Sequence, residues 1–226
     1  MISNEYIRLN RLIATTVFLV SFIVYYDTMA PTVSYWDCGE FIAVSHTLGV
    51  PHPPGSPFFL LLGRIASMLP ITEDIAFRVN LLSPISSAFA VMFLYLVIVL
   101  LVANWKGGIK NYQDSLVSFG GGVIGSLTFA FTDSHWFNAV EAEVYAFSTF
   151  FTAIVVWLIL KWNEKADEIG NERYILIIAY MIGLATGPHL LNLLAIPFIA
   201  LIIYFKKYEP NWKTFGYTVA ITGMVF

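Results

Sequence analysis

The sequence has little charge and almost no cysteine. Charged residues make up 12% of its 226 residues and hydrophobic residues 58%, whereas soluble domains carry about 25% charged and about 45–50% apolar residues. A soluble chain with so few charges could not cover its own surface, and a disordered chain would be far less hydrophobic. The single cysteine, Cys38, excludes an internal disulfide and a cysteine-based zinc site. The composition therefore indicates an integral membrane protein, and a net charge of −3 provides no polybasic surface for nucleic acid.

Long apolar runs predict an all-α, polytopic membrane protein with about seven transmembrane helices. A spanning helix needs roughly 20 mainly apolar residues. The runs on this scale are 12–26, 76–105, 116–132, 144–162, 174–186, 190–205 and 215–226. The segment 58–69 is apolar but short, and Arg64 interrupts it. We therefore expect this segment to lie at the membrane interface, or to re-enter the membrane, within the first outer loop.

The distribution of basic residues predicts the orientation of the chain. If the N-terminus is cytoplasmic, only Arg64 and Arg78 lie on the outer side, and the positive-inside rule supports this arrangement. All four histidines then lie on the outer side, with eight acidic residues that include Asp37, Glu40, Glu141 and Glu143. The other ten basic residues are cytoplasmic: Arg8, Arg11, Lys106, Lys110, Lys161, Lys165, Arg173, Lys206, Lys207 and Lys213. Ionisable groups near a membrane are costly and often functional, so the outer face is the expected site of chemistry.

The first outer loop carries two carboxylates in a pattern that suits proton transfer. Asp37 and Glu40 are three residues apart, so a helix over about residues 38–49 would place both on one face. Carboxylates among aromatic residues, with no basic residue adjacent, suit a group that accepts a proton. The alternative is structural, because Asp37 as N-cap and Glu40 at the third helical position resemble a capping box. The spacing leaves both interpretations open.

The remaining candidates on the outer side each have a structural alternative. His52 lies in the rigid turn PHPPG, where it either shapes the turn or binds substrate. Arg64 and Arg78 either snorkel to the interface or hold a phosphate group. Glu141 and Glu143 complement a helix dipole or face the site, and His189 caps a helix end or faces the same site. Asp133 and His135 add potential ligands for a divalent cation, but no metal-binding motif is present and we predict no metal site.

One stretch resembles a known family. Residues 35–65, YWDCGEFIAVSHTLGVPHPPGSPFFLLLGRI, resemble bacterial relatives of transmembrane protein 260, a protein O-mannosyltransferase family within the GT-C membrane glycosyltransferases. The shared elements are the Asp-x-Gly-Glu motif at 37–40 and His-Pro-Pro-Gly at 52–55. Weaker similarity covers WFNAVEAEVYAF at 136–147 and GLATGPHLLNLLAIP at 183–197. The resemblance extends over about residues 10–205 and implies a GT-C-like fold.

The resemblance also implies an activity and a location. Such enzymes transfer a sugar, here expected to be mannose, from a polyprenyl-phosphate donor to a protein Ser/Thr hydroxyl. The configuration at the anomeric carbon is inverted, and the resemblance implies no definite cofactor. Asp37 matches the general base, Glu40 would orient the acceptor or support Asp37, and Glu141 and Glu143 match the acidic second-loop element. The expected location is the inner (cytoplasmic) membrane, with the active site on the periplasmic side.

The family's proteins are usually much longer, so we expect residues 1–226 to be one transmembrane module, the N-terminal fragment of a larger enzyme; whether the fragment is active alone stays open. Its expected partners are the lipid-linked donor, a protein acceptor and membrane lipid. Two alternatives stay open: a non-catalytic lipid-binding or scaffold subunit, and a transporter. The mid-span residues are largely apolar, which disfavours a polar transport path.

Overall fold

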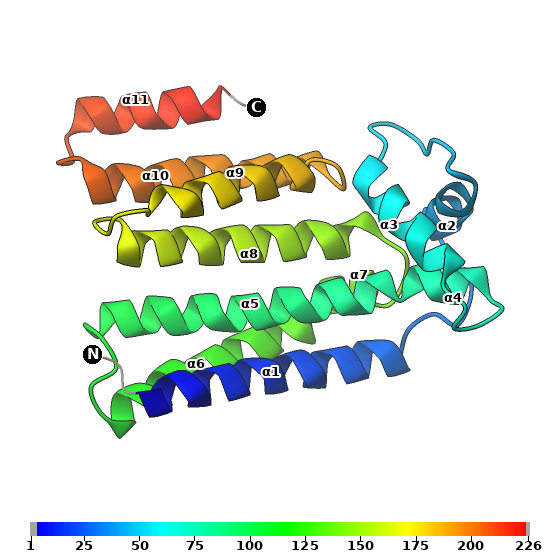
Figure 1. Cartoon of the computed structure of the whole chain (residues 1–226), viewed down its shortest axis with the longest axis horizontal. Helices are drawn as coiled ribbons and strands as arrows, with labels where there is room; N and C mark the ends of the chain where they lie inside the picture. The colour runs from blue at the N-terminus through cyan, green and yellow to red at the C-terminus, as the bar shows by residue number, and fades with distance from the viewer. Residues whose placement is uncertain (1–3, 225–226) are drawn as a thin grey trace.

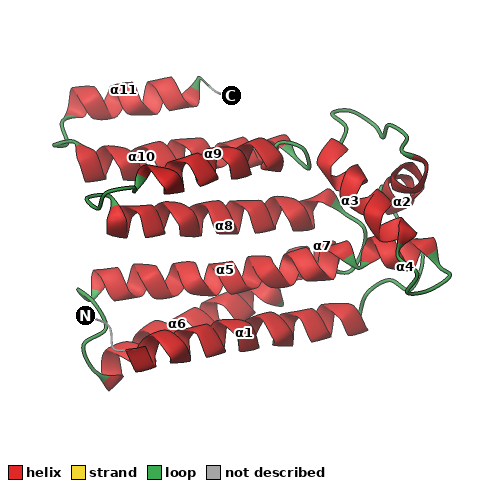
Figure 2. Cartoon of the chain, in the orientation of Figure 1, coloured by secondary structure: helices red, strands yellow, loops and turns green. Residues whose placement is uncertain are grey.

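The computed structural model describes residues 4–224, and within that range it is all-helical, without a strand (Figures 1 and 2). This confirms the predicted all-α class. In chain order the helices are α1 (Asn4–Asp27), α2 (Cys38–Thr47), α3 (Pro57–Met68), α4 (Ile75–Asn80), α5 (Leu82–Trp105), α6 (Tyr112–Ala130), α7 (Asp133–Ala139), α8 (Val144–Lys165), α9 (Glu172–Ala185), the 3-10 helix η1 (Leu190–Leu194), α10 (Ala195–Lys207) and α11 (Trp212–Gly223).

Within residues 4–224, four helical segments are long and apolar enough to cross a membrane: α1, α4 with α5, α8, and η1 with α10. A fifth is present if α6 and α7, which meet at a bend of 70°, count as one span. The expected number of about seven is not confirmed. The run at 174–186 forms most of α9, which has 14 residues, and the last run begins within α11, which has 12. Both are shorter than the roughly 20 residues of a full span, and the last two residues of the 215–226 run lie outside the described residues.

Helix α5 is the centre of the bundle and packs against α1, α6 and α8 (Figure 1). Small residues on its partner α6 permit this close approach. A Cβ atom on Gly122 would lie 2.8 Å from atoms of Tyr95 and Val99, and one on Gly125 would lie 2.8 Å from Ile98. Without much hydrophobic driving force between helices in lipid, such close packing is a main source of association.

Local sequence signals explain where several helices begin. The Asp74 carboxylate accepts hydrogen bonds from the first N–H groups of α4, and Asn111 and Asn211 do the same for α6 and α11. Pro57 occupies the first turn of α3, where its missing N–H would have had no helical partner. The first outer loop is therefore a set of short helices, of which α4 has a side-chain cap, and α3 is the short apolar helix expected there.

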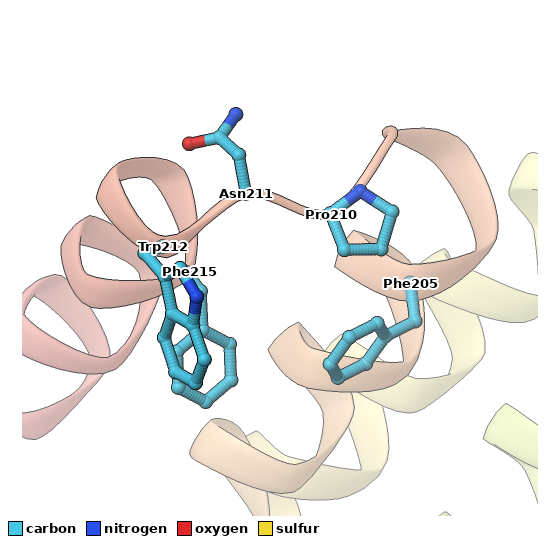
Figure 3. Close-up of a pocket in the computed structure, with 5 residues that line it drawn as sticks. All are labelled: Phe205, Pro210, Asn211, Trp212 and Phe215. Carbon is cyan, nitrogen blue, oxygen red and sulfur yellow. The ribbon is translucent and has the colours of Figure 1, made fainter.

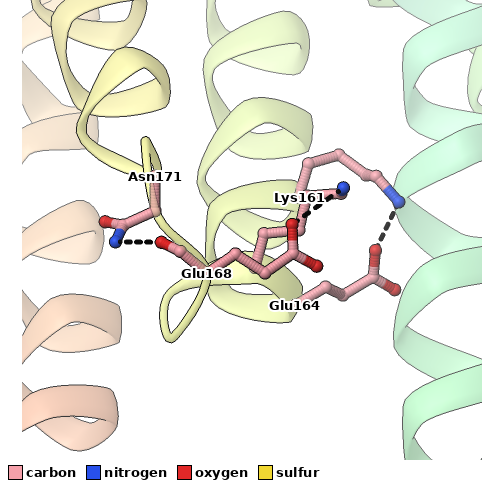
Figure 4. Close-up of polar contacts among 5 residues, drawn as sticks. Lys161, Glu164, Glu168 and Asn171 are labelled. Atoms are coloured by element: carbon pink, nitrogen blue, oxygen red, sulfur yellow. Dashed lines mark hydrogen bonds and ion pairs between the residues drawn. The ribbon is translucent and has the colours of Figure 1, made fainter.

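The lysine-rich connectors lie at the end of the bundle where α1 begins, whereas α2, α3 and α4 cover the opposite end (Figure 1). Acidic residues in the last turn of α8 and in the connector to α9 pair with nearby lysines. Lys161 pairs with Glu164, Lys165 with Glu168 at 3.2 Å (Figure 4), and Lys206 with Asp167 at 2.8 Å. The bond with Lys206 lowers the pKa of Asp167. Exposed pairs contribute little stability, so these charges serve the connector and carry no catalytic pattern.

The outer helices are packed against the bundle by an aromatic core. The rings of Phe41 and Phe59 lie 5.5 Å apart, and those of Phe59 and Phe147 lie 5.6 Å apart, so α2, α3 and α8 meet there. Gly187 packs directly on Phe58, because a Cβ atom at that glycine would lie 2.7 Å from the phenylalanine Cβ. The three outer loops are consequently held together as one cap on the bundle.

Candidate active site

Asp37 precedes α2 but does not cap it. Its backbone is in the right-handed helical region, and its side chain makes no capping hydrogen bond. Glu40 does not complete a capping box either, because both of its oxygens bond to His52. The His52 N–H lies 2.8 Å from Oε1 of Glu40, and the ring Nδ1 lies 2.6 Å from Oε2. The capping alternative is therefore wrong for this loop, and Asp37 is exposed with its carboxylate available.

The bond between Glu40 and His52 sets the charge of both groups. This hydrogen bond lowers the pKa of Glu40 and raises the pKa of the His52 ring above its usual value. The ring also contacts Phe41, with centroids 5.8 Å apart. The rigid PHPPG turn thus places His52 against α2, where the Glu40 carboxylate fixes its ring.

A pocket brings the three outer loops together. It has a volume of about 50 Å³, and its lining includes Asp37, His52, Glu143 and His189. Four of the eight predicted site residues are therefore neighbours, although they come from three separate loops. The Nδ1 of His189 accepts a hydrogen bond from the N–H of Leu191 and so caps η1 while the residue lines the pocket.

Glu143 is the most perturbed carboxylate of this pocket. It is only 6% exposed, and its side chain makes no capping bond to α8. Burial, followed by repulsion from the neighbouring Glu141 and Asp37 carboxylates, raises the pKa of Glu143 to about 7. A carboxyl group that titrates near neutral pH is suited to exchange a proton during catalysis.

Glu141 does not line the pocket, although it lies close enough to Glu143 to repel its carboxylate. It is 2% exposed, and its Oε1 atom has no hydrogen-bond partner among the described residues. A buried carboxylate oxygen without a partner is destabilising on its own. The structure therefore places Glu141 next to the site without making it a lining residue.

The residue before Asp37 has an unusual backbone. Trp36 has a φ of 59°, in the left-handed region that non-glycine residues rarely adopt. Its side chain is 84% exposed, and that of Tyr35 is 85% exposed. Such strain is frequent at functional sites, and here it fixes the direction in which the chain enters α2.

Arg64 and Arg78 do not line the pocket. Arg64 donates to the backbone carbonyl of His46, and Arg78 donates to the carbonyl of Leu69 at 2.9 Å. Both guanidinium groups therefore tie together outer helices and loops. Their predicted role as phosphate partners stays a prediction.

Among the described residues, Asp37, Glu40 and His52 form a group whose ligand atoms could hold a cation. One such atom from each lies within 4.8 Å of the others. The Glu40 carboxylate is already bonded twice by His52, so a cation would have to displace that pair. The larger cavities of the described chain lie elsewhere. One, of about 270 Å³, is lined by Phe205, Pro210, Asn211, Trp212 and Phe215 (Figure 3) and offers no carboxylate.

Two buried asparagines support the outer loops, although neither was predicted as a site residue. Asn192 bonds to Thr152 and to the carbonyls of Ala185 and His189, so it holds the third outer loop. Asn80 is fully buried and bonds to both the first and the second outer loop. The available signal was an amide within an otherwise apolar run, since buried polar groups in such a setting require partners.

The fold and the pocket together define a class: a helical membrane protein with a carboxylate- and histidine-lined site at one end of its bundle. The comparisons agree with this class. The family model described as "Protein O-mannosyl-transferase TMEM260 N-terminal domain" matches residues 37–212. The chain belongs to this TMEM260 N-terminal domain family.

Two relatives are named for the same family. Protein O-mannosyl-transferase tmem260 of Dictyostelium discoideum is 31% identical over 211 residues, which cover 87% of this chain and 24% of that protein. Protein O-mannosyl-transferase TMEM260 of Mus musculus is 29% identical over 149 residues, which cover 66% of this chain and 19% of that protein. The chain thus spans about a quarter or less of the length of these relatives. No solved structure matches it.

Proposed function

We propose that this chain is the N-terminal transmembrane module of an inverting, GT-C-type glycosyltransferase. The enzyme transfers mannose from a polyprenyl-phosphate donor to a Ser/Thr hydroxyl of a protein acceptor. The observation that carries the proposal is the meeting of Asp37, His52, Glu143 and His189 in one pocket. The names of the two relatives support mannose as the sugar and protein as the acceptor.

Asp37 is the general base in this proposal. Its exposed carboxylate takes the proton of the acceptor hydroxyl, and the hydroxyl oxygen bonds to the anomeric carbon of the sugar. The bond between that carbon and the phosphate oxygen breaks, and polyprenyl phosphate leaves with the bonding electrons. Because the hydroxyl attacks opposite the leaving group, the configuration at the anomeric carbon is inverted.

His52 is the proposed partner of the donor phosphate. Glu40 fixes the ring and favours its protonated form, which carries a positive charge into the pocket. Charge-assisted hydrogen bonds to phosphate are about twice as strong as neutral ones. Arg64 and Arg78 would first have to leave their carbonyl partners, so we assign them to the outer boundary of the donor site.

The proposed module lies in the cytoplasmic membrane with its N-terminus inside and the pocket on the periplasmic side. The separation of lysine-rich connectors from the pocket, at opposite ends of the bundle, supports this orientation. A volume of about 50 Å³ holds one or two water molecules. The pocket therefore marks where the reacting atoms meet, and the remainder of each substrate lies outside it.

The test is transfer of labelled mannose from a polyprenyl-phosphate donor to an acceptor protein by the full protein in membranes. Asp37→Asn is expected to lower kcat by roughly 10²–10⁴-fold, the usual contribution of a general base. Asp27→Asn, another exposed outer aspartate that does not line the pocket, is the matched control and should retain activity. Unchanged turnover in Asp37→Asn would exclude the base, and no transfer by the unmodified protein would favour a lipid-binding or scaffold subunit.

A further inference from the structure

The side chain of Asn80, the last residue of α4, uses all of its hydrogen-bonding capacity. Its Nδ2 donates to the carbonyls of Ala30 and Thr32, each at 2.9 Å. Its Oδ1 accepts from the N–H of Ala142 at 3.1 Å and from the thiol of Cys38 at 3.6 Å. An amide has two donor hydrogens and two acceptor lone pairs. One fully buried side chain thus joins the connector after α1, the start of α2 and the second outer loop.

The partners of Asn80 are adjacent to the acids of the pocket. Cys38 directly follows Asp37, and Ala142 directly precedes Glu143. Asp37 and Glu143 line the same pocket from these two segments. Asn80 therefore bonds to the residue next to each of these two carboxylates, through the thiol of Cys38 and through the backbone N–H of Ala142.

We propose that Asn80 is a positioning residue, which holds the Asp37 and Glu143 carboxylates at a fixed separation across the pocket. A backbone bond of 2.8 Å from the N–H of Ala30 to the carbonyl of Val140 joins the same two loops and acts in parallel. The catalytic consequence of this positioning rests on the proposed transferase function, whereas the positioning itself can be measured without it.

Replacing Asn80 with leucine preserves its bulk but removes every bond. The carbonyls of Ala30 and Thr32 and the N–H of Ala142 then lose their partner, and buried groups without partners destabilise the closed form. These groups can recover hydrogen bonds only from water, so the first and second outer loops separate.

Cys38 reports this separation, because it is the only cysteine and is fully buried against Asn80. The full protein in membranes is treated with a maleimide. Asn80→Leu is expected to label about 10-fold faster or more than the unmodified protein. Asn80→Asp keeps the oxygen that accepts from Ala142 but cannot donate to the two carbonyls. Because its second oxygen would face those carbonyl oxygens, it should also label faster than the unmodified protein, and it carries the test if the leucine variant does not fold.

Asn171→Leu is the matched control. Asn171 also bonds through both ends of its amide, to the indole of Trp162 and to the carbonyl of Glu168, but at the opposite end of the bundle (Figure 4). Its replacement should leave Cys38 labelling unchanged. A Cys38 labelling rate that is the same in the unmodified protein, Asn80→Leu and Asn80→Asp would overturn the proposal.

A second measurement separates positioning from general loss of stability. The groups that face Glu143 are Glu141, Asp37 and His52, and repulsion from Asp37 helps to raise its pKa. If Asn80→Leu, which adds no charge, lets Asp37 move away, the pH at which thermal stability changes through Glu143 should shift to lower values. A purely structural role would lower stability equally at every pH, and that result would refute positioning. Neither this measurement nor the labelling requires transferase activity, so failure of the proposed function would be recognised separately.

Discussion

His52 bonds both oxygens of the Glu40 carboxylate, one through its backbone N–H at 2.8 Å and the other through its ring at 2.6 Å. The pair connects α2 to the proline-rich turn that follows it. Because the turn is rigid, the imidazole can be oriented by one carboxylate without support from α1 or α5.

This pairing predicts the titration of the histidine. The pKa of His52 is raised by Glu40, so the bond stabilises the folded protein fully below the ordinary histidine value of 6.5. This stabilisation is lost as the pH rises through the higher pKa of the folded protein. The pKa of Glu40 is lowered, so its contribution is present above 4.5 and is lost as the pH falls further. The pair is thus strongest between about pH 4.5 and 6.5. Histidine-selective NMR should show a downward shift of the His52 pKa in Glu40→Gln and none in Glu73→Gln, whose side chain is exposed.

Glu143 predicts a loss of stability with rising pH. Its pKa is about 7 in the folded protein against an ordinary 4.5, so folding disfavours its ionised form. The free energy of unfolding is therefore highest, as far as Glu143 is concerned, below pH 4.5. It decreases by about 3 kcal/mol in total as the pH rises to about 7. Melting curves from pH 4 to 8 should show this decrease in the unmodified protein and its reduction in Glu143→Gln. An equal slope in both proteins would contradict the assignment.

Chelation is predicted to leave activity unchanged. The side chains of Glu40 and His52 are already hydrogen-bonded to each other, and Asp37 alone would bind a divalent cation weakly. Transfer of labelled mannose is measured before and after EDTA, and again after added Mn²⁺ or Mg²⁺. A loss that is restored by one cation would instead assign the group formed by Asp37, Glu40 and His52 to metal binding.

Packing of α6 on α5 predicts different results for neighbouring glycines. A side chain on Gly122 would overlap Tyr95 and Val99, so Gly122→Leu is expected to destabilise the protein by about 1–3 kcal/mol. Gly121 faces open space, and Gly121→Ala is the matched control, which should be neutral or slightly stabilising because alanine favours helix. Thermal unfolding in detergent measures both. Equal melting temperatures for the two variants would exclude the close contact.

Orientation is tested with single cysteines in a Cys38→Ser background. Tyr35 lies in the first outer loop, and Trp212 begins α11 at the opposite end; their side chains are 85% and 88% exposed. In intact cells an impermeant maleimide should label Tyr35→Cys. Trp212→Cys should react only after the membrane is opened. The reverse pattern would place the pocket in the cytoplasm.

Apolar runs and caps were sufficient to predict the helical class, the short helix α3 and the position of α1, α5 and α8. They could not predict the bend between α6 and α7, because both parts share similar composition and only tertiary contacts decide the angle. The spacing of Asp37 and Glu40 suited a capping box as well as a proton-transfer site. The capping box is excluded because Glu40 bonds to His52, a residue outside the predicted helix. The meeting of Asp37 with Glu143 and His189 could not be predicted either. Asn80 bonds to backbone groups 48, 50 and 62 residues away in the sequence, and Asn192 bonds to the side chain of Thr152, 40 residues away.

The dispersal of the pocket along the chain has a consequence for biosynthesis. Asp37 is translated early, but His189 follows only after α1, α5, α6, α8 and α9 have been made. During insertion the first outer loop is therefore made before the groups that complete its pocket, and Asp37 has no neighbouring Glu143 until the second outer loop has been made. A nascent chain cannot form the site before residue 189 has left the ribosome, so assembly of the pocket marks the point at which this module has been inserted correctly.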